Sequence, residues 1–424
     1  MKTAFKNIIA LSVLVFSFAC SKNKEIKIPK KEAMTASKIL GNPNYLAISY
    51  GGYREKSREI QPEIEALKED LKILSAMGIK IIRTYNVQPK LPHAANVLKA
   101  ITELKKEDAT FEMYVMLGAW IDCLNAWTDK APNHDIESAQ NAGEIDRAVA
   151  LANQYPDIVK IIAVGNEAMV KWATSYYVQP NVILKWVNHL QDLKTKGALS
   201  KDVWITSSDD FSSWGGGDAE YHTEDLEKLI HSVDYISMHT YAYHNSHYNP
   251  TFWKTPHHLR NLSDKEKIDA AMLRALNFAK NQYKGVFNYM KSLGVNKPVH
   301  IGETGWATTS NGHYGVNGSR ATDEYKQGLY YRHLRDWTQK AGISCFYFEA
   351  FDEQWKDAKN ANGSENHFGL INLKGEAKYP LWDLVDTGVF KGFTRNGKPI
   401  TKTFNGDTKA LMKTVLVPNT DYPR

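Results

Sequence analysis

The residues that decide the fold are 159–167, which read VKIIAVGNE. The first seven are almost continuously apolar, and this pattern predicts a strand buried on both faces, as in a parallel sheet covered by helices. Helical patterns flank the strand at residues 138–154 and 180–195. The stretch ends on a carboxylate, Glu167, which we expect to lie at the edge of the sheet where the strand ends.

Seven more apolar runs recur along the chain and are separated by further helical patterns. The runs cover residues 45–50, 79–85, 111–119, 203–208, 233–241, 299–303 and 343–350, and the helical patterns cover 61–77, 223–231, 263–293 and 322–341. Eight strands alternating with helices over about 350 residues predict an α/β fold, a (β/α)8 TIM barrel. A doubly wound open sheet is the alternative, but Gly51 and Gly52 do not form its usual phosphate-binding turn.

Composition narrows the class of protein. Of the 424 residues, 43% are hydrophobic, which excludes intrinsic disorder. The net charge of +6 comes from 53 basic and 47 acidic residues that are mostly interspersed, so we expect no nucleic-acid partner. The chain is rich in aromatics, with 22 Tyr and 11 Trp. Such residues suit flat, half-wet surfaces that stack on sugar rings or on partner proteins.

The N-terminus predicts export and a membrane anchor. Residues 1–19 resemble a signal peptide, with Lys2 and Lys6 before a short apolar segment. Cys20 follows Ala19 as in a bacterial lipoprotein, although Ser17 replaces the usual Leu, and ordinary signal-peptidase cleavage is the alternative. We expect a lipid on Cys20 and a flexible, Lys-rich tether over 20–38, which would make the protein an outer-membrane lipoprotein facing the surface or the periplasm.

The remaining chain is expected to fold as one unit. We place the barrel at 39–395 and a C-terminal extension packed on it at 396–424. No later segment has 18 consecutive apolar residues, so we expect no transmembrane helix. Cys123 and Cys345 are expected to be free, mostly buried thiols, because two isolated cysteines do not make a disulfide framework.

Two glutamates end predicted strands at the catalytic face of a barrel. Glu167 closes the fourth strand, and Glu303 closes the seventh within the run IGETGW at 301–306. A barrel glycosidase needs two carboxyls, one that donates a proton to the leaving oxygen and one that attacks the sugar or activates water. The pattern therefore predicts glycoside hydrolysis at this pair.

Three segments carry a resemblance to a known family. VGNE at 164–167, GETGW at 302–306 and FEAFDEQWK at 348–356 resemble glycoside hydrolase family 17, the endo-β-1,3-glucanases and glucanosyltransferases of the retaining 4/7 barrel superfamily. The resemblance covers about residues 40–390. It implies Glu167 as general acid/base and Glu303 as nucleophile, with no cofactor.

Further roles follow from the resemblance. It implies that Asn166 bonds the sugar 2-hydroxyl, that Tyr85 lies in the site, and that Glu353 and Lys356 support and polarise it. We also expect Lys356 to favour the ionised form of Glu303. Many members have Pro after the Trp of the seventh-strand motif, where this chain has Ala307. The resemblance therefore does not predict the shape of the sugar-binding subsite near Ala307.

Residue chemistry adds binding candidates. Tyr241 and Trp306, beside predicted strand ends, are expected to contact sugar, Trp306 as the floor of the cleft. Trp120 and Trp127 either form outer subsites or pack, and packing is favoured for Trp127. Other candidate cleft aromatics are Tyr50, Tyr53, Tyr243, Tyr248, Trp253 and Trp355.

Other polar groups in the loops could either bind a ligand or make structural contacts. A metal on His244 and His247 is not expected, because no third ligand has suitable spacing. The Asp209–Asp210 pair is expected to make capping or loop contacts. Glu349 and Asp352 either hold nearby cations or touch substrate.

The sequence therefore predicts a retaining endo-β-1,3-glucanase that acts on laminarin as a monomer. A β-1,3-glucanosyltransferase would use the same carboxylates, with a second glucan in place of water. A surface glycan-binding lipoprotein without catalysis is a hypothesis of another class.

Overall fold

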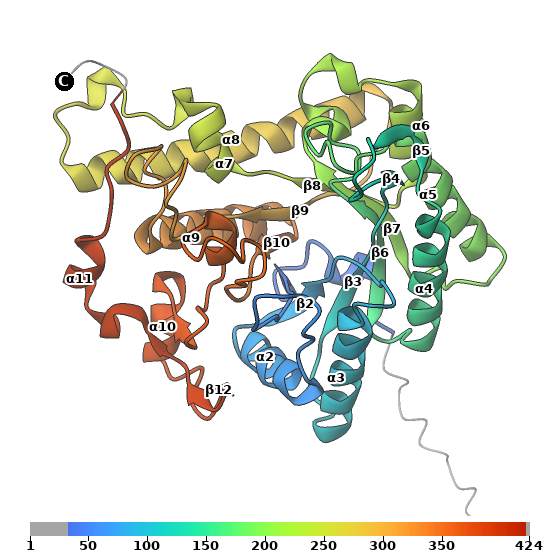
Figure 1. The fold of residues 1–424 in the computed structure, drawn as a ribbon, viewed down its shortest axis with the longest axis horizontal. Coiled ribbons are helices and arrows are strands. Elements are labelled where there is room, and N and C mark those ends of the chain that lie inside the picture. The colour runs from blue at the N-terminus through green and yellow to red at the C-terminus, as the bar shows by residue number, and fades with distance from the viewer. Residues whose placement is uncertain (1–32, 421–424) are drawn as a thin grey trace, which may run out of the picture. The chain divides into compact units, whose positions relative to one another are not determined.

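The computed structural model describes residues 33–420. The leader, Cys20 and the first part of the expected tether lie outside the described residues. The core of the described chain is a closed barrel of eight strands (Figure 1). In ring order these are β1 Leu46–Ser49, β10 Cys345–Phe348, β9 Val299–Gly305, β8 Ile236–His239, β7 Trp204–Asp210, β6 Val159–Asn166, β3 Tyr114–Ala119 and β2 Ile79–Arg83. Every neighbouring pair is parallel, so the predicted barrel and all eight strands are confirmed.

Helices follow the strands and lie outside the ring (Figure 1). They are α2 Ile64–Ala76, α3 His93–Glu107, α4 Gln140–Gln154, α5 Pro180–Thr195, α6 Glu224–Ser232, α8 Asp264–Ser292 and α9 Glu324–Ala341. The helix α8 begins at a capping box formed by Ser263 and Glu266, and α9 ends at Gly342 in the left-handed conformation. The helix α3 was not predicted, although Val97, Leu98 and Ile101 form a buried stripe.

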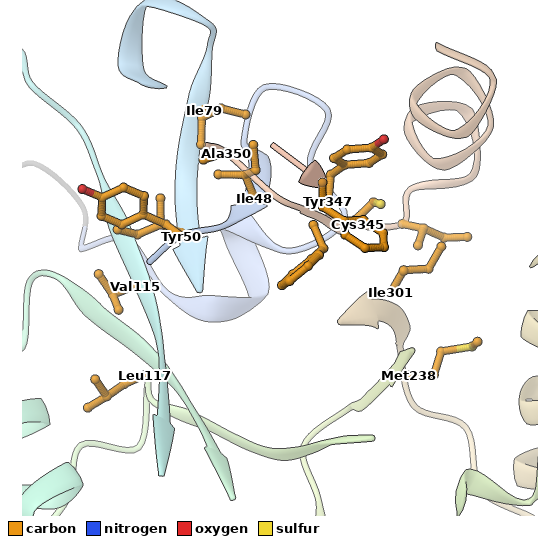
Figure 2. Close-up of a cluster of buried hydrophobic side chains, with 14 of the residues drawn as sticks. Ile48, Tyr50, Ile79, Val115, Leu117, Met238, Ile301, Cys345, Tyr347 and Ala350 are labelled. Atoms are coloured by element: carbon orange, nitrogen blue, oxygen red, sulfur yellow. The ribbon is translucent and has the colours of Figure 1, made fainter. Parts of the chain in front are cut away.

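Two layers of apolar side chains hold the barrel together, because successive residues of a strand point to opposite faces. One layer fills the interior and includes Ala47, Ile81 and Phe346. The other packs between strands and helices. Figure 2 shows members of it from several strands, including Ile48 of β1, Val115 and Leu117 of β3, Met238 of β8, Ile301 of β9 and Cys345 of β10.

The interior layer also receives a short helix that the sequence did not predict. Ala36 and Ile39 of α1 Ala36–Ile39 are fully buried among the inward-facing strand residues. The predicted boundary of the tether at residue 38 is therefore wrong. Because these two side chains lie three apart on one helical face, burying them removes apolar surface from water and fixes residues 36–38 to the barrel.

The segment after β10 is tied back to the barrel. The strand β14 Thr401–Lys402 pairs with β11 Glu376–Ala377, and a hairpin of β12 Thr394–Arg395 and β13 Lys398–Pro399 crosses the expected boundary at 395. Buried Arg395 forms an ion pair with buried Asp70 of α2 at 2.9 Å. Beyond α11 Thr408–Met412, the Leu416 amide donates to Asp323.

Other features bear on the predictions made from sequence. Cys123 and Cys345 are free and buried, as expected. Among residues 33–420, no helix combines the length and the apolarity that crossing a bilayer requires.

Candidate active site

The carboxyl ends of β6 and β9, the fourth and seventh strands of the barrel, bring the two glutamates together. The Glu167 amide donates to the Ser208 carbonyl on β7, and Glu303 pairs in register with His239 on β8. Glu167 has a φ of 48°, a left-handed conformation that a non-glycine residue seldom adopts. Such backbone outliers concentrate at functional sites, where surrounding contacts hold them in place.

The separation of the two carboxylates is short. One oxygen of Glu167, one of Glu303 and one ring nitrogen of His239 all lie within 4.8 Å of one another. Retaining glycosidases hold their carboxyl groups about 5–5.5 Å apart, and inverting enzymes about 6.5–9.5 Å, to leave room for a water. The gap therefore fits direct attack by a carboxylate better than attack by an intervening water.

Glu303 is held by three donors. Arg83 Nη1 donates to Oε2 at 2.7 Å, Tyr85 Oη donates to the same oxygen at 3.1 Å, and Tyr241 Oη donates to Oε1 at 2.5 Å. Arg83 also bonds the Gly302 carbonyl at 2.8 Å. With both oxygens engaged, the orientation of the carboxylate is fixed before any substrate binds.

These donors decide the charge of Glu303. Burial by itself would raise the pKa of Glu303, but opposing interactions leave that pKa below its ordinary value. A protonated His239 would contribute, yet burial lowers the pKa of His239 to about 3, so this ring is neutral at pH 7. The Arg83 cation and the two phenol hydrogen bonds therefore keep Glu303 ionised.

Glu167 has the opposite environment. Burial raises the pKa of Glu167 well above its ordinary value, and the negative charges of Glu303, Asp210 and Asp209 add to the effect. Its Oε1 lies 3.0 Å from Nδ1 of His239, whose Nε2 lies 2.8 Å from Ser208 Oγ. The pKa values of the two neighbouring carboxyls thus shift in opposite directions, so that Glu167 tends to stay protonated and Glu303 tends to stay ionised. Acid/base chemistry at neutral pH requires such a difference.

Asn166 completes the group around the pair. Its Oδ1 accepts a hydrogen bond from Nη2 of Arg83. Its Nδ2 hydrogens can donate to a sugar hydroxyl. The structure thus brings Asn166, Tyr85 and Tyr241 together with the two glutamates. Sequence reasoning did not anticipate that Arg83 would bond both Glu303 and Asn166.

Lys356 occupies a different place from the one expected. It forms ion pairs with Glu349 and, at 3.2 Å, with Glu353. Glu353 in turn accepts from the Tyr53 amide at 3.1 Å. The expectation that Lys356 supplies the positive charge for Glu303 is wrong, because Arg83 makes that contact. Lys356 and Glu353 instead form part of the wall of the cavity that contains Glu303.

The remaining polar candidates make structural contacts. Glu349 pairs with Lys356, and Asp352 pairs with Lys378 at 2.7 Å. Asp209 accepts from the Met169 amide at 2.7 Å, and Asp210 accepts from Ser212, as expected of loop contacts.

At the glutamate pair, bound metal has less support than acid/base chemistry. His244 lies 3.0 Å from the Tyr314 hydroxyl, and the His247 ring stacks on His313. Within the described residues, Glu167, His239 and Glu303 are the one group close enough to share a metal ion. The Arg83 cation already bonds that group, which favours an acid/base pair.

A cavity of about 730 Å³ opens beside Glu303. Its walls include Asn166 and Glu303 together with aromatic side chains from several loops, namely Tyr50, Tyr53, Tyr85, Trp120, Trp127, Tyr176 and Trp355. The size and the mixture of apolar rings with a few polar groups are typical of ligand sites.

Trp306 is not part of this cavity. It is fully buried, its indole nitrogen donates to the Ala321 carbonyl at 2.8 Å, and its ring packs against Trp253 and Tyr330. The prediction that Trp306 forms the cleft floor is therefore wrong. Tyr243 and Trp253 are buried in the same core, so these two cleft candidates are wrong as well.

The chain is a (β/α)8 barrel with two glutamates at the ends of its fourth and seventh strands, and their pKa values are shifted in opposite directions. These features define a glycoside hydrolase of the barrel class. The family model of the BtgE/BtgC glycoside hydrolase domain matches residues 47–369, and the chain belongs to this family. The resemblance predicted from the three sequence segments is thereby confirmed.

Two known proteins similar to the chain bear the names of glucan-cleaving enzymes. The crystal structure of an endo-laminarinase from Formosa superposes with a TM-score of 0.91 and 65% identity, covering 92% of this chain and 99% of that one. A putative glucan endo-1,3-beta-glucosidase btgC from Aspergillus niger is 24% identical over 342 residues, which is 75% of this chain and 40% of the relative. The chain thus spans less than half of that relative's length.

A more distant structure supports the fold alone. A beta-1,3-glucanosyltransferase from Rhizomucor miehei, an active-site mutant in complex with laminaritriose, is 18% identical with a TM-score of 0.54. It covers 80% of this chain and 96% of that chain.

Proposed function

We propose that the protein is a retaining endo-β-1,3-glucanase that hydrolyses laminarin-type glucans. The observation that carries the proposal is the glutamate pair, in which one oxygen of Glu167 lies within 4.8 Å of one oxygen of Glu303 and the two pKa values are shifted in opposite directions. Glu303 lines the cavity. The endo-laminarinase, which is 65% identical over nearly its whole length, supports the choice of substrate.

In the first step, Glu167 donates its proton to the glycosidic oxygen while Glu303 attacks the anomeric carbon. The bond from that carbon to the leaving oxygen breaks, and a covalent bond to Glu303 forms. Arg83, Tyr85 and Tyr241 hold the nucleophile in position, and Asn166 is placed to bond the sugar 2-hydroxyl.

In the second step, Glu167 has lost its proton and acts as the base. It removes a proton from water, which attacks the anomeric carbon and releases Glu303. His239 contacts Glu167 in both steps, and because its ring is neutral it can donate to the carboxylate without adding a charge. The Glu167 proton is thereby restored, and no cofactor enters the cycle.

Product analysis tests this function. Purified protein is incubated with laminarin and with a β-1,4-glucan, and products are separated by chromatography over time. We expect laminarin to give a series of shorter oligosaccharides from the earliest times and the β-1,4-glucan to give none. Products longer than the starting oligosaccharide, at high oligosaccharide concentration, would support glucanosyl transfer instead. Binding without any product would support the non-catalytic hypothesis.

Removing the Arg83 cation should shift the pH dependence of the reaction. Glu303 must be ionised to attack, and Arg83 helps keep its pKa low. In Arg83→Met we expect the acidic limb of kcat/KM against pH to move upward by about one unit or more. Arg83→Lys, which keeps a charge, should move that limb less. An acidic limb that stays in place in Arg83→Met, measured on folded protein, contradicts Arg83 as the group that tunes Glu303.

We also propose that the protein is exported and anchored through a lipid on Cys20. The support is the sequence of residues 1–20, which lies outside the described part of the chain. A Cys20→Ser variant expressed in a Gram-negative host should leave the membrane fraction, whereas retention there would contradict the anchor.

We propose a monomeric barrel, which light scattering of the lipid-free protein would test.

A further inference from the structure

A hairpin beside the catalytic cavity presents an unusual tryptophan. It consists of β4 Cys123–Leu124 and β5 Asn133–Glu137, which pair antiparallel after β3. In its turn, Asn125 has a φ of 65° and Trp127 a φ of 61°. A bulky side chain in the left-handed region is a true outlier, maintained only where other contacts enforce it. The turn holds the indole at the cavity wall.

Trp127 packs against the rings of Tyr176 and Trp120, the latter with centroids 6.2 Å apart, and most of its surface is exposed. Its ring stacks on Tyr176, with centroids 4.9 Å apart and planes 21° apart, and Trp120 lies 5.2 Å from the same Tyr176 ring. Tyr176 is buried, whereas Trp127 is 62% exposed. We call Trp120, Trp127 and Tyr176 the indole platform. The sequence favoured packing for Trp127, and the structure leaves most of its surface free.

The platform shares a cavity with Glu303. Its three residues line the same cavity as Asn166 and Glu303. Tyr176 comes from the segment that follows β6, and burial followed by the negative charge of Glu167 raises the pKa of Tyr176, which places the ring within the field of that carboxyl. A chain bound across the glutamates can therefore extend onto the platform without leaving the cavity.

We propose that the indole platform is an outer subsite that binds a pyranose ring of β-1,3-glucan away from the bond being cleaved. The proposal rests on the proposed function. Pyranose rings present apolar C–H faces, and a flat, exposed indole offers a matching surface at little conformational cost. An exposed apolar group of this size next to a ligand cavity is typical of a binding surface. Chains too short to reach Trp127 gain nothing from it, so the subsite makes the enzyme prefer longer glucans.

The chain contains a matched control. Trp172 is 61% exposed, almost the same as Trp127, and lies in the loop after β6. It is not among the residues that line the cavity. Trp172→Ala therefore removes an equally exposed indole from the same region without touching the platform, while Trp127→Phe retains an aromatic face.

The experiment measures kcat/KM on laminari-oligosaccharides of increasing length and on laminarin. Trp127→Ala should lose about tenfold on the longest substrates, mainly through KM, and nothing on the shortest, because one stacking contact disappears. Trp127→Phe should recover most of this loss, and Trp172→Ala should match the wild type at every length. Thermal unfolding of each variant separates a binding effect from loss of fold.

The outcomes distinguish this inference from the proposed function. If the wild type cleaves laminarin but Trp127→Ala behaves like it at every length, the subsite is wrong and the function stands. An equal loss on short and long substrates overturns the subsite too, because it indicates damage at the catalytic pair. If the wild type releases nothing from any length, the proposed function itself fails.

Discussion

Glu303→Gln is expected to fold normally and to release reducing sugar from laminarin at least about 10³-fold more slowly than the wild type. An amide cannot form the covalent glycosyl bond, and its neutral group cannot stabilise the positive charge that develops on the sugar in the transition state. Arg83 would also lose its charge partner at 2.7 Å, so some loss of stability accompanies the loss of rate.

The control separates chemistry from folding. Glu112 lies at the amino end of β3, at the opposite end of the barrel strands, and also bonds two tyrosines and a lysine. Glu112→Gln should therefore keep its activity even where its melting temperature falls. Near wild-type release of sugar by folded Glu303→Gln would remove Glu303 from the role of nucleophile.

Glu167→Gln is expected to lose about 10²–10⁴-fold on laminarin, the usual contribution of general acid/base catalysis. The loss should depend on the leaving group. On an aryl β-glucoside whose phenolate departs without protonation, the first step needs no acid and should remain fast. The second step still lacks its base, so the covalent intermediate should accumulate.

Rapid-mixing kinetics reveal that intermediate as a burst. Glu167→Gln should release about one equivalent of nitrophenolate per enzyme and then slow sharply. A similar loss on the aryl substrate and on laminarin, without a burst, would show that Glu167 acts on something other than the leaving group. The double variant Glu167→Gln with Glu303→Gln should give no burst at all, because it lacks the nucleophile.

The barrel could be predicted because its strands are buried on both faces and therefore appear as unbroken apolar runs. The helix α3 was not predicted, although its buried apolar stripe is present in the sequence. The hairpin of β4 and β5 could not be predicted in the same way. Its strands contain few buried residues, and its turn depends on positive φ values at Asn125 and Trp127, which neither residue type requires.

The sequence predicted both glutamates, and the structure brings them together, but their environment was only partly predictable. Arg83 and His239 lie in otherwise apolar strand runs. Because a buried charged or polar group needs a partner, their positions alone predict that each contacts another polar group. Which carboxyl each would meet depends on the closure of the ring. The orientation of the Trp306 side chain could not be predicted either, because proximity to Glu303 along the chain does not decide whether a ring faces the cavity or the core.

The central claim is that the two glutamates cleave by double displacement, and the anomeric configuration of the first product tests it most directly. Proton NMR is recorded on freshly mixed protein and a laminari-oligosaccharide, before mutarotation equilibrates the new reducing end. Two inversions at one carbon predict that the β-anomer signal rises first and the α-anomer follows slowly. An α-anomer signal that rises first would mean a single displacement by water and would contradict a covalent bond to Glu303.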